Sequence, residues 1–272
     1  MSEKAQKTAK RITELDLLRG IAVLLMIFDH IMFDMWGLFP TVFYNYPPFE
    51  GFWREAYDFS VFYWNWSVRI TVRYFIVFIF LALTGICCSF SKSNLKRGLK
   101  LGAVALLMTA ATYIVGQVIG DVDITIVFGV LHCIALTLII IGVLEKLGTS
   151  KWVYLAVGVG MIVLGWYLER GQMYYSFKRM EFFELLWRTV IGSAACGGDS
   201  FSLFFNGGQI FVGVFLGKLL YREKRSLVFR KYHASPITFI GRHSLVVYVL
   251  HQALIPVVFG GVMLACGFSF GM

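Results

Sequence analysis

The sequence predicts an all-α integral membrane protein, a polytopic bundle of about seven transmembrane helices with one further interfacial or re-entrant helix. Three observations support this prediction: the composition, the lengths of the apolar runs, and the separation of basic from acidic loops. Of the 272 residues, 58% are hydrophobic and 15% are charged, with a mean hydropathy of +0.72. Soluble globular chains carry about 25% charged residues, so this composition indicates a membrane protein.

Each spanning helix needs about 20 mostly apolar residues to cross the hydrocarbon core. Runs of that length occur at 15–36, 71–90, 99–119, 124–144, 152–168, 203–221 and 238–266. The last run is longer than one span, and Pro256 is expected to kink it or to separate a span from a re-entrant tail. Residues 1–14 are expected to form a cytoplasmic segment, and residues 15–272 a single transmembrane domain.

Basic and acidic residues fall in alternate connections between these runs. The basic connections contain Lys4, Lys7, Lys10, Arg11, Lys92, Lys96, Arg97, Lys100, Arg222, Lys224, Arg225, Arg230 and Lys231. By the positive-inside rule, these connections and the N-terminus are cytoplasmic. The net charge of +9 is therefore mostly a topology signal, and no nucleic-acid partner is needed to explain it. The expected surroundings are the lipids of a plasma (inner) membrane, and a homodimer is left open.

Two shorter features complete the fold prediction. The segment "EFFELLWRTVIGSAACGGDSF" (181–201) predicts a short interfacial or re-entrant helix that ends at its glycine pair and leaves Asp199 near the external side. The five cysteines show no metal-ligand spacing, so they are interpreted as packing residues and no metal is expected. A disulfide between Cys196 and Cys266 is left open.

The first run, "DLLRGIAVLLMIFDHIMFD" (16–34), contains ionisable residues where a span is normally most apolar. At 100° per residue, Asp16, Arg19, His30 and Asp34 fall on one stripe, whereas Asp29 points elsewhere. Arg19 and His30 are eleven residues apart, about 16 Å along a helix. A structural interpretation pairs Arg19 with Asp16 and treats His30 as packing. Because intramembrane ionisable groups are costly and usually face a site, the functional interpretation is favoured for His30.

Three stretches resemble one family in the expected order. "LDLLRGIAVLLMIFDH" (15–30), "FGVLHCIAL" (128–136) and "GRHSLVVYVLHQ" (241–252) are similar to segments of the heparan-α-glucosaminide N-acetyltransferase catalytic-domain family and of related bacterial envelope acyltransferases. The stretch 197–217 keeps an aspartate of the family's later element, Asp199, without its prolines and tryptophan. The resemblance implies a transmembrane enzyme that moves an acyl group, with acetyl expected, from cytoplasmic acyl-CoA to an external sugar or amino sugar.

The resemblance and the chemistry together suggest roles for the polar residues. His30 would be the general base, because an imidazole titrates near neutral pH, and Asp34 would orient it. Direct attack on the thioester and an acyl-histidine intermediate are both left open. The anionic donor would be held by the cationic residues Arg19, Arg242, Arg97 and Lys100.

The acceptor is expected to bind on the external side of the membrane. Ser244, Tyr248 and His251 follow one another at i, i+4 and i+7, so they form one polar face of the last helix. His132, predicted to lie in mid-membrane, and Asp199 are further candidates for acceptor binding. The aromatic connection 36–69 either stacks on sugar rings or fills the membrane interface.

Two other functions are compatible with the same residues. The buried His, Asp and Arg side chains could form the relay of a proton-coupled transporter or flippase, although the inverted repeats typical of transporters are not recognisable in the sequence. A catalytically inactive scaffold or sensor, in which His30 would be dispensable, is the third. The sequence does not distinguish N- from O-acylation, nor does it fix the acyl chain length.

Overall fold

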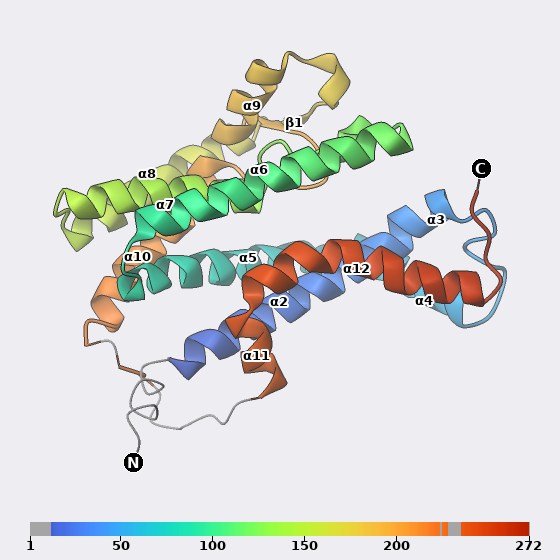
Figure 1. Ribbon diagram of the computed structural model, residues 1–272, viewed down its shortest axis with the longest axis horizontal. Coiled ribbons are helices and arrows are strands. Elements are labelled where there is room, and N and C mark those ends of the chain that lie inside the picture. Colours follow the sequence, from blue (N-terminus) through green and yellow to red (C-terminus); the bar gives the residue numbers. More distant parts are fainter. Residues whose placement is uncertain (1–11, 224, 228–234, 272) are drawn as a thin grey trace. The chain divides into compact units, whose positions relative to one another are not determined.

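The computed structural model describes residues 12–223, 225–227 and 235–271, and these form helices with short connections (Figure 1). The chain divides into two compact units, described separately below: unit 1 comprises residues 1–80 and 228–272, and unit 2 comprises residues 81–227. Residues 1–11 of the expected cytoplasmic segment lie outside the described part, as do Lys224, Arg230 and Lys231.

Unit 1 is built around its first helix. Its elements are α2 (Thr13–Phe33), the π-helical turn η1 (Asp34–Leu38), α3 (Phe39–Val42), α4 (Phe52–Asn65), the first part of α5 (Ser67–Ile86), α11 (Pro236–Arg242) and α12 (Ser244–Ala265). Both α11 and α12 pack on α2, so the first helix is held by segments from the other end of the chain (Figure 1).

The overlong last run is divided at a different point from the one predicted. The chain breaks at His243, where α11 ends and α12 begins, whereas α12 continues through Pro256. The short helix α11 has its own start signals, because Ser235 caps it through the Thr238 N–H and Pro236 occupies its first turn. Arg242 therefore belongs to α11, and not to the helix of His251 as the sequence suggested.

Two glycines bring α2 and α11 into close contact. A Cβ atom on Gly241 would meet the backbone oxygen of Asp16, and one on Gly20 would meet the backbone oxygen of Ile237. Small residues allow helix backbones to approach closely in membranes, where packing replaces the hydrophobic effect as the driving force. The glycines of "LLRG" and "GRHS" are therefore the two sides of one helix contact.

We expect Gly241→Ala to lower the thermal stability of the protein, because its methyl group overlaps the α2 backbone and neither backbone can yield cheaply. Overpacking of this kind costs about 1–3 kcal/mol. The matched control is Gly261→Ala in α12, where a Cβ meets nothing within 4 Å. Thermal unfolding in detergent monitored by size-exclusion fluorescence measures both; equal melting temperatures for the two variants would contradict the proposed contact.

Unit 2 consists of two helix pairs and an irregular connection. Its helices are the last part of α5, the 3-10 turn η2 (Cys87–Phe90), α6 (Asn94–Ile119), η3 (Val122–Ile124), α7 (Val130–Lys146), α8 (Lys151–Glu169), η4 (Phe177–Arg179), α9 (Phe182–Ile191), the π-helical turn η5 (Leu203–Gly207) and α10 (Gly208–Leu220). Two short parallel strands, β1 (Met173–Tyr174) and β2 (Ala194–Ala195), flank α9. Helix α6 packs on α7, and α8 packs on α10.

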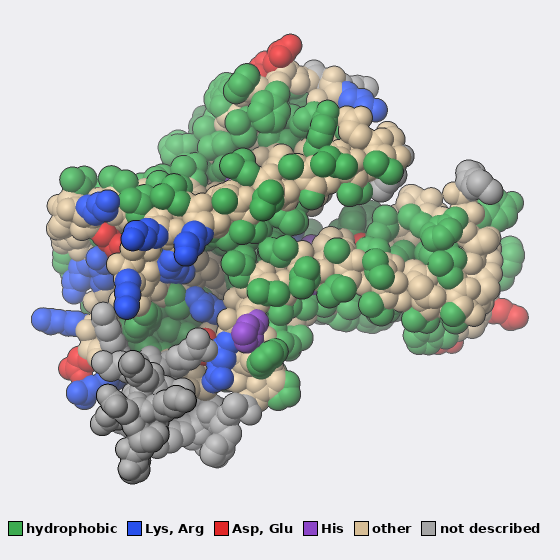
Figure 2. Space-filling view, in the orientation of Figure 1, with side chains coloured by type: hydrophobic (Ala, Val, Ile, Leu, Met, Phe, Trp, Pro, Cys, Tyr) green, Lys and Arg blue, Asp and Glu red, His purple; other side chains and the backbone are tan. Residues whose placement is uncertain are grey.

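Basic side chains gather at one end of unit 2. Figure 2 shows Lys and Arg side chains gathered at the left of the view, where α6 begins and α10 ends in Figure 1. The basic residues at the start of α6, the end of α7, the start of α8 and the end of α10 are Lys96, Arg97, Lys100, Lys146, Lys151 and Lys218. The acidic residues Asp121 and Asp123 follow α6, and Glu169 ends α8. Apolar side chains cover much of the helix surface between these ends.

The helices confirm an all-α polytopic bundle. Among the described residues, six segments are long and apolar enough to span a membrane: Thr13–Val42, Ser67–Phe90, Asn94–Val118, Lys151–Glu169, Leu203–Leu220 and Ser244–Ala265. The fourth predicted run is represented by α7, a 17-residue helix. The predicted short helix is α9, but it ends at Gly192, whose φ of 98° is left-handed, and not at the later glycine pair. Cys196 and Cys266 are free thiols.

Candidate functional site

Polar side chains line one contact that the first helix of unit 1 makes with its last two helices, α11 and α12, which we call the α2–α12 seam. On one side it consists of Asp16, His30 and Asp34, and on the other of Arg242, His251 and Gln252. Arg242 Nε donates to Asp16 Oδ2 at 3.3 Å. The rings of His30 and His251 meet edge to face, with centroids 4.7 Å apart. The polar stripe predicted on the first helix is therefore the face that α2 turns towards α11 and α12.

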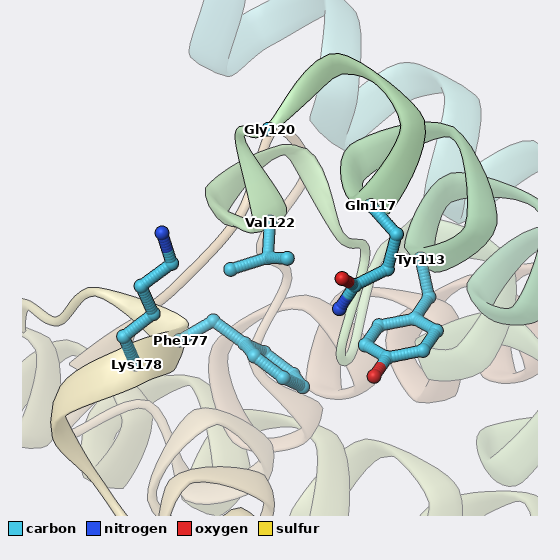
Figure 3. Close-up of a pocket in the computed structure, with 6 residues that line it drawn as sticks. All are labelled: Tyr113, Gln117, Gly120, Val122, Phe177 and Lys178. Carbon is cyan, nitrogen blue, oxygen red and sulfur yellow. The ribbon is translucent and has the colours of Figure 1, made fainter.

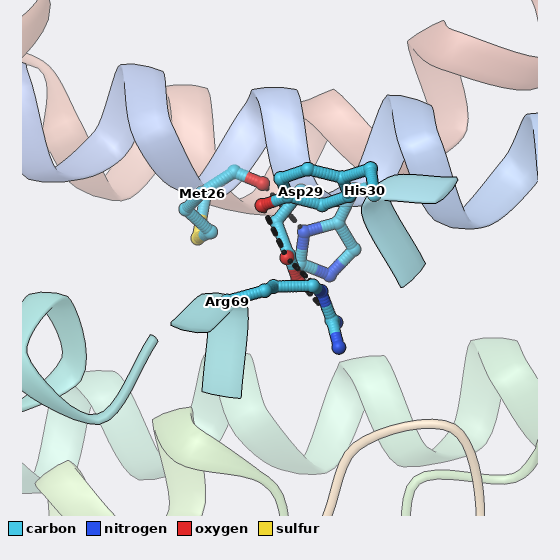
Figure 4. Close-up of polar contacts among 5 residues, drawn as sticks. Met26, Asp29, His30 and Arg69 are labelled. Carbon is cyan, nitrogen blue, oxygen red and sulfur yellow. Dashed lines mark hydrogen bonds and ion pairs between the residues drawn. The ribbon is translucent and has the colours of Figure 1, made fainter. Parts of the chain in front are cut away.

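Both seam histidines are held by backbone carbonyls of their own helices. Nδ1 of His30 lies 2.8 Å from the carbonyl oxygen of Met26 (Figure 4), and Nδ1 of His251 lies 2.6 Å from that of Tyr248. A carbonyl can only accept, so each Nδ1 is assigned the proton, and in the neutral ring Nε2 carries the lone pair. The Nε2 atom of His251 is buried and has no hydrogen-bond partner among the described residues. The seam thus presents two imidazole nitrogens that can accept protons.

One turn beyond His30, the seam contains a fully buried carboxylate. Asp34 is 0% exposed and begins η1, the π-helical turn that follows α2. Its Oδ1 accepts a hydrogen bond from Gln252 Nε2 at 3.3 Å. The sequence suggested that Asp34 orients His30, but in the structure Met26 orients the His30 ring and Asp34 binds Gln252. Single π-turns inside helices are frequent at functional sites.

Asp29 lies beside the seam and is paired with Arg69, which is not one of the site residues predicted from the sequence. Arg69, near the start of α5, donates from Nε to Asp29 Oδ1 at 2.9 Å and from Nη2 to Asp29 Oδ2 at 3.3 Å (Figure 4). The two side chains are 8% and 19% exposed. The Arg69 guanidinium also lies 3.5 Å from the ring centroid of Trp64. The pair therefore fixes α5 and the end of α4 against α2 at the residue next to His30.

Tyr63 completes this arrangement. Its hydroxyl donates to Asp29 Oδ1 at 3.0 Å. Burial and the adjacent Asp29 carboxylate raise the pKa of Tyr63 to about 12, so the hydroxyl keeps its proton and remains a donor. The sequence contains two signals of this pair: an arginine, Arg69, just before an apolar run, and an aspartate, Asp29, that points away from the polar stripe. That the two side chains pair follows only from the position of α5.

The four cationic residues predicted to bind the donor fall in different units. Arg19 lies in unit 1, half-buried in the first half of α2, and Arg242 is close by on α11, where it pairs with Asp16. In unit 2, Arg97 donates to Asn94 Oδ1 at 3.0 Å, whereas Lys100 is exposed. The structural interpretation of the sequence paired Asp16 with Arg19, whereas in the structure Asp16 pairs with Arg242.

Ser244 and Tyr248 belong to unit 1. Ser244 is the first residue of α12, seven residues before His251. Tyr248 supplies the carbonyl that holds His251, and its ring lies 5.5 Å from the His251 ring. The structure therefore brings Tyr248 together with His251, while Ser244 lies about 10 Å along the helix from His251.

His132 and Asp199 belong to unit 2, where they meet at the start of α7. His132 lies in the first turn of that helix and not near its middle as the apolar run suggested, because α7 begins only at Val130. Its Nδ1 accepts from the Gly129 N–H at 3.3 Å, and its Nε2 lies 3.1 Å from the Thr109 hydroxyl. Asp199 Oδ2 accepts from the Val130 N–H at 3.0 Å. Both side chains thus satisfy donors at a helix N-terminus.

Unit 2 also has an open pocket of about 530 Å³, shown in Figure 3. It is lined by Tyr113, Gln117, Gly120, Val122, Phe177 and Lys178. No sequence-predicted site residue belongs to this lining. Within the described ranges, no group of three or more His, Cys, Asp or Glu side chains has the arrangement of a metal site.

The fold and the seam define a multi-pass α-helical membrane protein with ionisable side chains buried between its spans. The chain belongs to the family described as "Heparan-alpha-glucosaminide N-acetyltransferase, catalytic", whose model matches residues 11–253. The match includes α2 and reaches past His251 in α12, and it confirms the resemblance seen in the sequence. The protein is thus a membrane protein of an acetyltransferase-type family. No curated protein and no solved structure matches the chain.

Proposed function

We propose that the protein is a membrane-embedded acyltransferase of the plasma membrane. It moves an acyl group, with acetyl the expected one, from cytoplasmic acyl-CoA to an amine or hydroxyl of a sugar or amino sugar on the external side. Family membership supports the reaction class. The observation that carries the proposal is the histidine pair of the seam, in which each Nδ1 is bound to a backbone carbonyl and Nε2 is left as a base.

The proposed reaction needs one proton to move twice. Nε2 of His30 accepts the proton of the attacking N–H or O–H, while the nucleophile forms a bond to the thioester carbonyl carbon. The carbon–sulfur bond then breaks and the electron pair leaves with the sulfur. The imidazolium returns the proton to this thiolate, so the products are the acylated acceptor and coenzyme A. The Met26 carbonyl keeps the ring oriented through both transfers.

The charged end of the donor is proposed to bind near the start of α2. Arg19 and Arg242 lie at this end, about 16 Å along the helix from His30. The pantetheine arm of coenzyme A has a comparable extended length, so phosphates bound here would be compatible with a thioester near the histidines. Guanidinium groups suit phosphate because they donate two hydrogen bonds in one plane.

Donor binding is tested by calorimetry of acetyl-CoA with the full-length protein in nanodiscs. We expect micromolar binding, weakened about tenfold or more in Arg19→Ala through loss of a charge-assisted contact. Arg54→Ala is the matched control, because the Arg54 side chain is 42% exposed and pairs with Asp58 within α4. If the wild-type protein does not bind acetyl-CoA, the acyltransferase proposal fails and the transporter alternative gains support.

A further inference from the structure

Hydrogen-bond acceptors without partners gather at one place on the seam. Nine buried side-chain atoms have no hydrogen-bond partner among the described residues, and three of them belong to adjoining seam residues: Asp34 Oδ2, His251 Nε2 and Gln252 Oε1. Gln252 follows His251 in the chain, and it binds Asp34 through its other amide atom. These atoms therefore belong to residues that adjoin in the chain or are hydrogen-bonded to one another, and His251 is also one ring of the His30–His251 contact.

In their unprotonated forms all three atoms accept hydrogen bonds. A carboxylate only accepts, so the Gln252 atom that faces Asp34 Oδ1 must be the NH₂ group, and the unpartnered amide atom is the carbonyl oxygen. His251 uses its Nδ1 proton on the Tyr248 carbonyl, which leaves a lone pair on Nε2. The group that complements this cluster is consequently a donor, such as the N–H or O–H of a bound molecule.

The burial of these atoms makes them costly to leave without a partner. Asp34 is 0% exposed and His251 is 7% exposed. A buried polar atom that lacks a partner forfeits its full hydration, and the penalty is larger for a charged group. Side chains placed only for packing do not need this arrangement, because apolar residues of similar volume would fill the same space without that penalty. Intramembrane carboxylates typically mark substrate or ion pathways.

We propose that Asp34 and Gln252 are specificity-determining residues that hold the N–H or O–H group of the acceptor beside His30. The inference rests on the proposed function and extends it to Gln252. Asp34 Oδ2, Gln252 Oε1 and His251 Nε2 accept hydrogen bonds from the acceptor molecule. The Gln252 amide also holds Asp34 in place through Oδ1, so that Oδ2 is available to the ligand.

The test separates acceptor binding from donor binding. Initial rates of acetyl transfer from acetyl-CoA to D-glucosamine are measured for the wild-type protein and for Gln252→Leu and Asp34→Asn. We expect the KM for glucosamine to rise about tenfold or more in both variants, the loss that accompanies a hydrogen bond to a charged group. The KM for acetyl-CoA should change by less than about twofold, because the donor is bound elsewhere. A KM for glucosamine that stays at the wild-type value overturns the inference.

Controls keep the inference distinct from the proposed function. Gln172→Leu is the matched glutamine change, because the Gln172 amide donates to the Gly192 and Ala194 carbonyls outside the seam. D-glucose in place of glucosamine distinguishes hydroxyl from amine recognition. If the wild-type protein shows no transfer to either sugar, calorimetry of glucosamine alone still tests the cluster. Binding that is lost in Gln252→Leu supports it, and failure of the wild-type protein to bind overturns it.

Discussion

His30→Ala is expected to lower the rate of acetyl transfer by about 10²–10⁴-fold, the range typical for loss of a general base. The structure supplies the reason, because the Met26 carbonyl fixes the His30 ring with Nε2 as its proton acceptor. Binding of acetyl-CoA should persist in this variant, since the proposed cationic contacts are three turns away. A steady-state transfer assay and calorimetry on the same preparation measure the two effects separately.

His243→Ala is the matched control for this prediction. His243 is exposed at the break between α11 and α12, and its ring contacts Phe239 outside the seam. Its rate should stay within about threefold of the wild-type value, as expected for a surface substitution. A near-normal rate in His30→Ala would contradict the assignment and would move the proton transfer to His251, which has the same tautomer and faces the same contact.

Arg69→Leu is expected to destabilise the protein by about 3–5 kcal/mol, which is the cost of removing one partner of a buried ion pair. The substitution leaves the Asp29 carboxylate, at 19% exposure, with the Tyr63 hydroxyl as its neutral donor. It also removes the guanidinium from the face of Trp64. Unfolding in lipid nanodiscs, followed by Trp fluorescence, measures the loss.

Two further variants determine whether the charge of Asp29 is the cause. In the double variant Asp29→Asn/Arg69→Leu no carboxylate is left unpaired, so it should recover more than half of the lost stability. Arg54→Leu breaks an exposed pair on α4 and should cost less than about 1 kcal/mol. Equal destabilisation by Arg69→Leu and Arg54→Leu would show that the Asp29–Arg69 pair is not a structural anchor.

Helical periodicity predicted the part of the site that lies on one helix. Asp16, His30 and Asp34 were placed on a single stripe by counting residues, and all three contact α11 or α12. The sequence motif around His251 likewise pointed to the last helix. These predictions needed only the α-helical repeat and the high energetic cost of polar groups in lipid.

The partners of these residues could not be predicted in the same way. Gln252 was not selected because a single glutamine in an apolar run gives no signal until Asp34 is found opposite it. Arg69 lay at the edge of an aromatic connection and looked like one of many interfacial residues. His132 was misplaced because the apolar run continues upstream of Val130, whereas the helix does not. For Gln252 and Arg69 the deciding information is a contact between distant segments.

The sequence separations of these contacts set an order for biosynthesis. Asp29 meets Arg69 only 40 positions later, so its charge can be paired soon after α5 enters the bilayer. Asp34 meets Gln252 across 218 positions, and Asp16 meets Arg242 across 226. All of unit 2 is therefore synthesised while the first helix still lacks the partners of its polar face. The two histidines come together only when α12 is inserted, so a partly translated chain cannot carry out the proposed proton transfer through this pair.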